Sequence, residues 1–242
     1  MISKTEVIYQ VTENEYIRQT LLDGVPEYDS KFADCRTDEE RIALTETYVN
    51  MLFLENLYDR ESDGAAKKRL FVDMDGTLAV WNPTKKLEEL YEEGYFKNLK
   101  PYEEVVEAVR YLVQNEPGIE VFVLSAYLSD SQYALAEKNE WLNTYLPEID
   151  MQHRCFCHCG TDKSLAVPGG IRTTDHLLDD YTINLNDWCP PGVGLKLLNG
   201  INDTHKSWKG DRISRLQPAE DIANAIMRII ESSINLEEGI DL

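Results

Sequence analysis

Two different spacings of apolar residues divide this chain of 242 residues into an N-terminal part and a longer remainder. In the N-terminal part, apolar residues recur at the spacing of one helix face: Leu44, Tyr48, Met51 and Leu52. Thr37 and Glu40 fit a capping box at the start of that helix. A polar, glycine-containing tract at 61–64 then breaks the pattern. We therefore expect a helical N-terminal extension over residues 1–66 and a second domain over residues 67–242.

Beyond residue 66, short apolar runs alternate with segments of helical spacing. The apolar runs predict strands at 70–73, 120–125, 152–159, 175–180 and 194–199. The segments between and after them predict helices at 102–114, 131–145 and 218–232. Several strands are apolar throughout, which is typical of a parallel sheet covered by helices on both faces. We therefore expect an α/β fold for residues 67–242.

Charge and cysteine content narrow the possible partners and location. The chain has 44 acidic and 24 basic residues, a formal net charge of −20. This disfavours binding to a nucleic acid polymer, because phosphate backbones need clustered lysine and arginine. No apolar run reaches the roughly 18–20 residues of a membrane span, and the N-terminus lacks the apolar core of a signal peptide. Since the five cysteines also form a poor disulfide framework, we expect a cytoplasmic protein that contacts no membrane.

The most informative chemical signal lies where an apolar run ends in two aspartates, Asp73 and Asp75, followed directly by glycine. Clustered carboxylates are costly to bury unless they bind a cation or take part in chemistry. Other polar positions lie at or beyond the ends of later expected strands: Ser125, Lys163 and the pair Asp179-Asp180. The carboxyl ends of parallel strands meet at one edge of a sheet, so these side chains should converge there.

Such a set of groups suits phosphoryl transfer. A divalent cation and a lysine can neutralise the phosphate charge that would otherwise repel an anionic nucleophile. A hydroxyl group and backbone N–H groups can hold the remaining phosphate oxygens. A carboxylate nucleophile would form an acyl phosphate and divide hydrolysis into two easier steps. Each residue alone has an ordinary structural explanation, so the prediction depends on their occurring together in this order.

In this order and spacing, the motifs resemble those of haloacid dehalogenase (HAD) superfamily phosphatases across residues 69–230. The resemblance implies a Rossmannoid, HAD-like sheet and a magnesium-dependent phosphatase that acts through an aspartyl-phosphate intermediate. It implies that Asp73 is the nucleophile and that Asp75 is the general acid and base. It also implies two sets of ligands: Ser125, Ala126 and Lys163 for the phosphoryl group, and Asp73, Asp75 and Asp180 for Mg²⁺. The sequence leaves open whether Asp179 or Asp180 contacts the metal.

A narrower resemblance concerns the substrate. Residues 73–81, 94–101, 178–181 and 199–202, with Trp188, resemble the bacterial branch of the 5′-(deoxy)ribonucleotidase family. This implies a nucleoside monophosphate substrate, with base and sugar left open. Residues 78–101 would then form a short cap insertion of 24 residues, in which three aromatic residues are candidates to stack on the base: Trp81, Tyr95 and Phe96. As a hypothesis, the N-terminal extension packs near the active site and supplements this cap.

Alternatives remain for the substrate and for several side chains. The substrate could be another small phosphorylated metabolite, or the fold could serve as a non-catalytic module. Histidines and cysteines cluster at 153–159, but their spacing differs from a Cys-x2-Cys zinc site and no second cluster exists. We therefore interpret three of them as core residues on one face of a strand: Cys155, Cys157 and Cys159. Three other residues either line the pocket or pack in the core: Trp188, His205 and Trp208.

Overall fold

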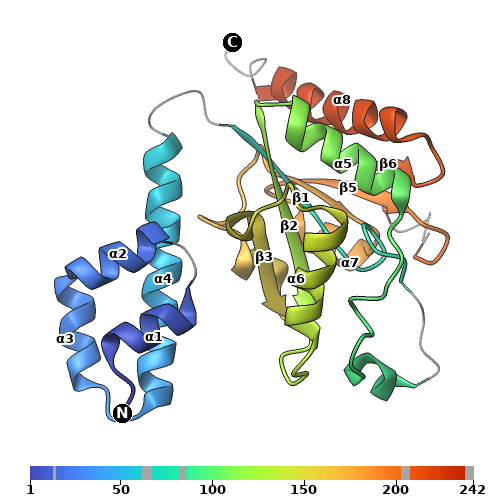
Figure 1. Cartoon of the computed structure of the whole chain (residues 1–242). Coiled ribbons are helices and arrows are strands. Elements are labelled where there is room, and N and C mark those ends of the chain that lie inside the picture. The colour runs from blue at the N-terminus through green and yellow to red at the C-terminus, as the bar shows by residue number, and fades with distance from the viewer. Residues whose placement is uncertain (13–14, 62–66, 82–85, 203–207, 238–242) are drawn as a thin grey trace. The chain divides into compact units, whose positions relative to one another are not determined.

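The computed structural model of the chain describes residues 1–12, 15–61, 67–81, 86–202 and 208–237. The chain divides into two compact units, Met1–Ala66 and Lys67–Leu242 (Figure 1). Among the helices within these ranges, none combines the length and the apolar character that crossing a membrane requires.

The described part of the N-terminal unit is helical, as predicted. Its helices are α1 (Lys4–Val11), α2 (Glu15–Asp23), α3 (Pro26–Asp34) and α4 (Asp38–Glu61). Their buried apolar residues form one cluster that contains Val7, Leu21 and Tyr28. The predicted capping box of α4 is confirmed, because Glu40 N donates to Thr37 Oγ1 at 3.1 Å and Thr37 N donates to Glu40 Oε2 at 3.2 Å.

The inward face of α4 differs from the predicted one at a single position. Tyr48 is buried and Leu44 and Leu52 pack against the cluster, but Met51 is exposed. Thr45 is fully buried instead, and its hydroxyl hydrogen-bonds to the hydroxyl of Tyr28 at 2.9 Å. The apolar spacing could not identify this threonine, because a hydrogen bond makes its burial possible.

The C-terminal unit contains a six-stranded sheet in the order β3-β2-β1-β4-β5-β6, and all neighbouring strands are parallel. The strands are β1 (Lys68–Val72), β2 (Ile119–Tyr127), β3 (Arg154–His158), β4 (His176–Asp179), β5 (Val193–Leu198) and β6 (Asp211–Ser214). The predicted α/β fold with a Rossmann-like sheet is therefore confirmed. The edge strand β6 escaped prediction because Ile213 is the one buried residue among its four.

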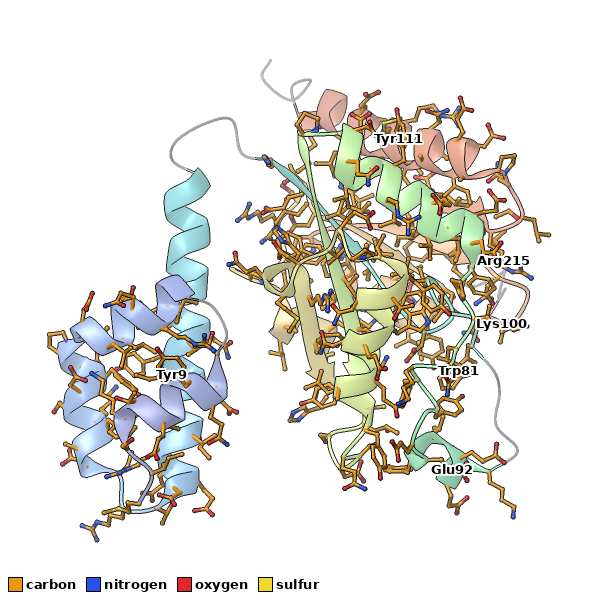
Figure 2. The ribbon with its side chains drawn as sticks, in the orientation of Figure 1. Tyr9, Trp81, Glu92, Lys100, Tyr111 and Arg215 are labelled. Atoms are coloured by element: carbon orange, nitrogen blue, oxygen red, sulfur yellow. The ribbon has the colours of Figure 1, made fainter. Side chains whose placement is uncertain are left out.

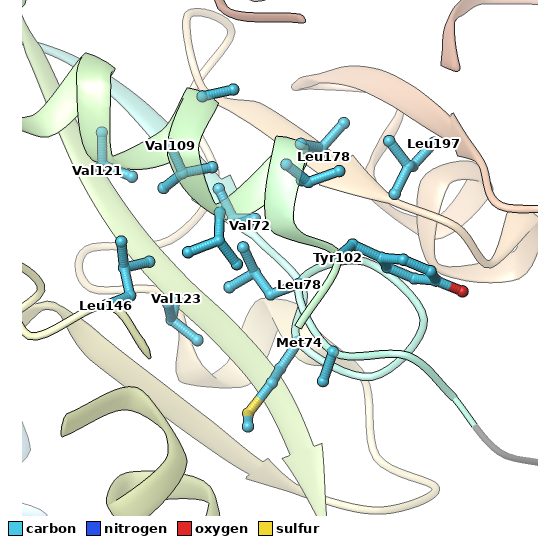
Figure 3. Packing of buried hydrophobic residues seen from close by; sticks show 14 of the residues in the cluster. Val72, Met74, Leu78, Tyr102, Val109, Val121, Val123, Leu146, Leu178 and Leu197 are labelled. Carbon is cyan, nitrogen blue, oxygen red and sulfur yellow. The ribbon is translucent and has the colours of Figure 1, made fainter. Parts of the chain in front are cut away.

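Helices cover both faces of this sheet, and β1 shows how the sequence achieves this. Leu70 and Val72 join a cluster with α5 (Glu103–Asn115), α6 (Ala134–Tyr145) and α8 (Ala219–Glu237), which Figure 3 shows from close by. Phe71 points to the opposite face, where its ring lies 5.2 Å from that of Trp188 in α7 (Thr182–Trp188). Because both faces of β1 are covered, its side chains are apolar at successive positions. The connections also contain 3₁₀ helices η1 (Leu87–Tyr91), η2 (Met151–His153) and η3 (Lys163–Ala166).

The three clustered cysteines do not share one environment. Cys155 and Cys157 are buried in β3, but Cys159 lies beyond the end of the strand and is exposed. Its interpretation as a core residue is wrong because the strand ends one residue earlier, at His158. Trp188 and Trp208 both belong to a buried cluster, which favours a packing role, whereas the predicted His205 lies outside the described residues.

Candidate active site

The chain turns sharply where β1 ends, and this turn carries both aspartates of the first motif. Asp73 N still donates to Leu178 O of β4 at 2.9 Å. The carbonyl group of Met74 then accepts from the N–H groups of residues 77, 78 and 79 at 2.8–3.2 Å, which closes a tight loop. Gly76 has a φ of +88°, and a Cβ atom there would lie 2.6 Å from Asp180 Oδ2. Glycine is therefore needed for this loop to approach Asp180.

Asp73 shares a buried lysine with Asp179. Lys163 Nζ, at the start of η3, donates to Asp73 Oδ1 at 2.6 Å and to Asp179 Oδ2 at 2.8 Å. Asp179 also accepts from Tyr181 N at 2.7 Å and from Asn184 Nδ2 at 2.8 Å, one bond on each carboxylate oxygen. Both oxygens of Asp179 are thus held by donors of the chain itself.

Asp180 completes a group of three buried carboxylates. One oxygen each of Asp73, Asp179 and Asp180 lies within 4.8 Å of the other two. Asp180 Oδ2 is fixed by the amide groups of Asn199 at 2.7 Å and Asn202 at 2.6 Å. These distances would let the three carboxylates share a single ion.

The pKa values of these groups reflect the burial of like charges. Burial raises the pKa of Asp73 to about 7; Lys163 opposes this rise, and the charges of Asp179 and Asp180 add to it. Burial, with the charge of Asp179, also raises the pKa of Asp180 to about 6. For Lys163, burial acts to lower the pKa, but the charges of Asp179 and Asp73 outweigh it and raise the pKa. The remaining repulsion and the all-oxygen donor set fit a divalent cation such as Mg²⁺.

A second buried lysine, Lys138 of α6, holds the other aspartate of the loop. Its Nζ donates to Asp75 Oδ2 at 2.5 Å and to Ser125 Oγ at 3.0 Å. It also lies 5.1 Å from the centre of the Phe96 ring, and its side chain is fully buried. The other oxygen, Asp75 Oδ1, is buried and has no hydrogen-bond partner within the described part of the chain. The two aspartates of this loop thus have different lysines and different surroundings.

Lys138 was not among the predicted site residues, although the sequence contained a signal for it. The residues four before and four after it, Ala134 and Leu142, are fully buried on the same face of α6. A lysine between two such residues must bury its ammonium group, which requires polar or acidic partners. The apolar spacing of α6 therefore contained the evidence for a second cation in the site.

Most of the predicted site residues lie together at the carboxyl edge of the sheet. Lys163 links Asp73 to Asp179 at the end of β4, and Lys138 links Asp75 to Ser125 of β2. Ala126 is the next residue of β2 and is half-buried. Its side chain is a methyl group, so a polar contact from this residue would have to come from its main chain.

Residues 78–101 leave this edge of the sheet and return to the same place. Leu78 O accepts from Tyr102 N at 2.8 Å, and Val80 N donates to Lys100 O at 2.7 Å. The two ends of the segment are therefore joined by backbone hydrogen bonds, and the described residues between them, 81 and 86–99, form one insertion at this edge of the sheet.

The insertion places a row of aromatic side chains beside Asp75. The ring centres of Trp81 and Tyr95 lie 6.3 Å apart, and those of Tyr95 and Phe96 lie 5.0 Å apart; Trp81 is labelled in Figure 2. Burial, together with the charges of Asp75 and Glu89, raises the pKa of Tyr95 to about 12. Because Phe96 also contacts Lys138, the row adjoins the aspartate that Lys138 holds.

Comparisons with known proteins agree with this arrangement. Residues 74–223 match the model of a protein family described as 5′ nucleotidase, deoxy (pyrimidine), cytosolic type C protein. Two similar proteins come from Staphylococcus aureus, strains Mu50 / ATCC 700699 and MSSA476, and each is named "Putative 5′(3′)-deoxyribonucleotidase". Each is 25% identical to this chain over 169 residues, which are 70% of this chain and 78% of the relative. Residues 1–66 lie outside the region that the family model matches.

Proposed function

This chain belongs to the cytosolic type C family of 5′ nucleotidases, and on that premise we propose that it hydrolyses (deoxy)nucleoside monophosphates in a Mg²⁺-dependent reaction. The names of its relatives favour a nucleotide as the substrate class. The observation that carries the mechanism is the pairing of two aspartates of one loop with two separate buried lysines, Asp73 with Lys163 and Asp75 with Lys138. Each aspartate can then take a different chemical role.

Asp73 is the nucleophile in this proposal. Its carboxylate attacks phosphorus, the bond between phosphorus and the ester oxygen breaks, and an aspartyl phosphate forms. Lys163 favours the ionised carboxylate, which burial alone would disfavour. The same ammonium group can stabilise the charge that develops on the phosphoryl oxygens.

Asp75 moves the protons. Lys138 holds its Oδ2 atom, which leaves Oδ1 to carry the proton that the departing ester oxygen receives. In the second half-reaction the same carboxylate takes a proton from water, which attacks phosphorus and breaks the bond to Asp73. Inorganic phosphate and the free carboxylate of Asp73 are then restored.

The acidic group supplies the ligands for Mg²⁺. We assign the metal to Asp73, Asp180 and the main-chain carbonyl of Asp75, because both oxygens of Asp179 are already held by other donors. When bound, Mg²⁺ would neutralise negative charge on the phosphoryl group and on the carboxylates. Asp179 then acts by fixing Lys163.

The phosphoryl group and the nucleoside occupy different parts of the site. Ser125, the main chain of Ala126 and the two buried lysines surround the position of the phosphoryl group. The insertion at 78–101 acts as a cap, and the two partly exposed rings of its aromatic row, Trp81 and Tyr95, stack on the base. Phe96 is buried in the core and supports Tyr95. The protein is placed in the cytoplasm in this proposal, with no nucleic acid polymer or membrane as a partner.

The test is phosphate release from a panel of ribo- and deoxyribonucleoside monophosphates, with Mg²⁺ and with a chelator. We expect Mg²⁺-dependent release from at least one nucleotide and none with the chelator. Faster release from a sugar phosphate than from every nucleotide would assign the enzyme to another small metabolite. Failure to release phosphate from any ester would indicate a non-catalytic module.

A further inference from the structure

The residue before Lys138 is a buried carboxylate that the phosphoryl transfer does not use. Glu137 is only 4% exposed, yet Lys138 turns towards Asp75 and does not pair with it. Its carboxylate instead accepts hydrogen bonds from three backbone N–H groups of the cap. Oε1 accepts from Gly94 N, and Oε2 accepts from Phe96 N at 3.0 Å and Lys97 N at 3.4 Å.

These three N–H groups form a small concave site for an anion, and Glu137 fills it. Backbone N–H groups that point to one spot bind anions such as carboxylates and phosphates. Gly94 makes the turn possible with a φ of +92°, and Asn98 Nδ2 donates to Gly94 O at 2.7 Å. Because Glu137 occupies these donors, the loop can contact a substrate through its side chains rather than through these N–H groups.

A second contact from the same helix fixes the other end of the loop. Trp141 lies one turn after Glu137 in α6, is fully buried, and its Nε1 donates to Leu99 O at 2.7 Å. Residues 94–99 are thus attached to α6 at two points. Between these points in the sequence, Lys138 of the same helix contacts Asp75, Ser125 and the ring of Phe96.

We propose that Glu137 is a positioning residue that gives the enzyme its preference for esters with a large aromatic leaving group. It acts by locking the Tyr95–Phe96 turn onto α6, beside the aspartate that protonates the leaving group. The aromatic row is then held beside the position of the nucleoside. Its distance from Asp75 is set by α6 and not by the substrate. This inference rests on the proposed nucleotidase function and adds to it the residue that sets the substrate preference.

The experiment compares two substrates in the full-length enzyme with Mg²⁺: the best nucleoside monophosphate of the panel and glycerol 1-phosphate, which has no ring. In Glu137→Gln, one of the oxygens becomes an NH₂ group that faces a backbone N–H donor, so the loop is released. We expect KM for the nucleotide to rise by about 10- to 100-fold, because a small displacement of a positioning group has effects of that order. Values of kcat/KM for glycerol 1-phosphate should stay within about threefold, because its reacting groups are not displaced.

Two further variants keep the test decisive. Glu140→Gln is the matched control. Glu140 lies on the same helix, is 61% exposed, and contacts the same loop through an ion pair with Lys97 at 3.7 Å. Exposed ion pairs contribute little, so the kinetic constants for both substrates should be unchanged. If Glu137→Gln fails to fold, Trp141→Phe keeps the buried ring, removes the bond to Leu99, and should raise the nucleotide KM in the same direction by a smaller factor. Equal losses for both substrates in the folded variants, or no loss for either, would overturn the inference. A wild-type enzyme that does not hydrolyse nucleotides would instead overturn the proposed function.

Discussion

Replacing Asp73 by asparagine should remove activity and, in the metal-free protein, make the fold more stable at neutral pH. Asp73 is 5% exposed, and three neighbouring carboxylates add to the cost of its charge. Asparagine has nearly the same shape and no charge. Lys163 keeps Asp179 as a partner at 2.8 Å, so the substitution does not leave a buried ammonium group unpaired.

The size and sign of the effect follow from the pKa of Asp73, which burial raises from 3.8 to about 7. Since the folded state holds the proton more tightly than the unfolded state, the stabilising contribution is present at low pH and is lost as pH rises from about 4 to about 7. At about 1.4 kcal/mol per pH unit, the whole loss is about 4 kcal/mol, of which about 3 kcal/mol falls between pH 5 and pH 8. Between pH 5 and pH 8 the free energy of unfolding of the wild-type protein should therefore fall by about 3 kcal/mol relative to that of Asp73→Asn.

Tryptophan fluorescence during thermal unfolding with a chelator present measures this difference. All four tryptophans lie in the Lys67–Leu242 unit, so the signal reports the unit that carries Asp73. The melting temperature of Asp73→Asn relative to wild type should increase by roughly 6–12 °C between pH 5 and pH 8. Comparing the two proteins at each pH cancels the opposite effect of His176, whose pKa burial lowers to about 4. Asp187→Asn, an exposed aspartate of the same unit, is the control and should show no such trend.

If the difference stays constant from pH 5 to pH 8, Asp73 is not a buried carboxyl group with a raised pKa. Added Mg²⁺ should raise the melting temperature of wild type more than that of Asp73→Asn, because the carboxylate is then a ligand instead of an uncompensated charge. Equal effects of Mg²⁺ on the two proteins would contradict the assignment of Asp73 as a metal ligand.

Three other predictions test separate parts of the site. Lys138→Met should lower kcat/KM by about 10²–10³-fold with the far-ultraviolet circular dichroism spectrum retained, because it removes the buried donor to Asp75 and Ser125; a change below about threefold would show that Lys138 is only structural. Gly76→Ala should weaken Mg²⁺ binding, measured by calorimetry, and destabilise the fold by about 1–3 kcal/mol, since its Cβ would lie 2.6 Å from Asp180 Oδ2 at a φ of +88°; unchanged Mg²⁺ affinity would contradict this. If the N-terminal unit supplements the cap, a truncated chain starting at Lys67 should lose selectivity among nucleotides. A folded truncation with unchanged selectivity would show that this hypothesis is wrong.

The sequence was sufficient to predict those parts of the molecule in which a residue pattern is compatible with few structures. Apolar runs without alternation identified the central strands. The loop after β1 revealed its carboxylates because two clustered aspartates at the end of an apolar strand are tolerable in few other arrangements. Edge strand β6 and the short helix α7 were missed, because an edge strand with one buried residue and a seven-residue helix have weak periodicity. Cys159 is exposed because β3 ends at His158, and the alternation of residues along a strand does not show where the strand ends.

The missed contacts all depended on the tertiary structure. Lys138 and Glu137 are adjacent in α6, yet one contacts Asp75 and the other contacts the cap, which is separated from it by about 40 positions in the sequence. Sequence spacing identified neither partner, although the apolar face of α6 indicated that Lys138 had to be buried. The proposed choice of Asp180 over Asp179 as a ligand likewise depends on hydrogen bonds to both oxygens of Asp179, from Lys163 and Tyr181.

In the proposed mechanism the phosphoryl group passes through Asp73, and rapid acid quenching with a nucleoside monophosphate labelled in its phosphate can detect that intermediate. Full-length enzyme is mixed with this substrate and Mg²⁺, quenched during turnover, digested with protease, and analysed for the labelled peptide. We expect an acid-stable, hydroxylamine-sensitive label on the peptide that contains Asp73, and neither label nor turnover in Asp73→Asn. Label on another residue, or turnover by Asp73→Asn at a rate near that of wild type, would contradict it.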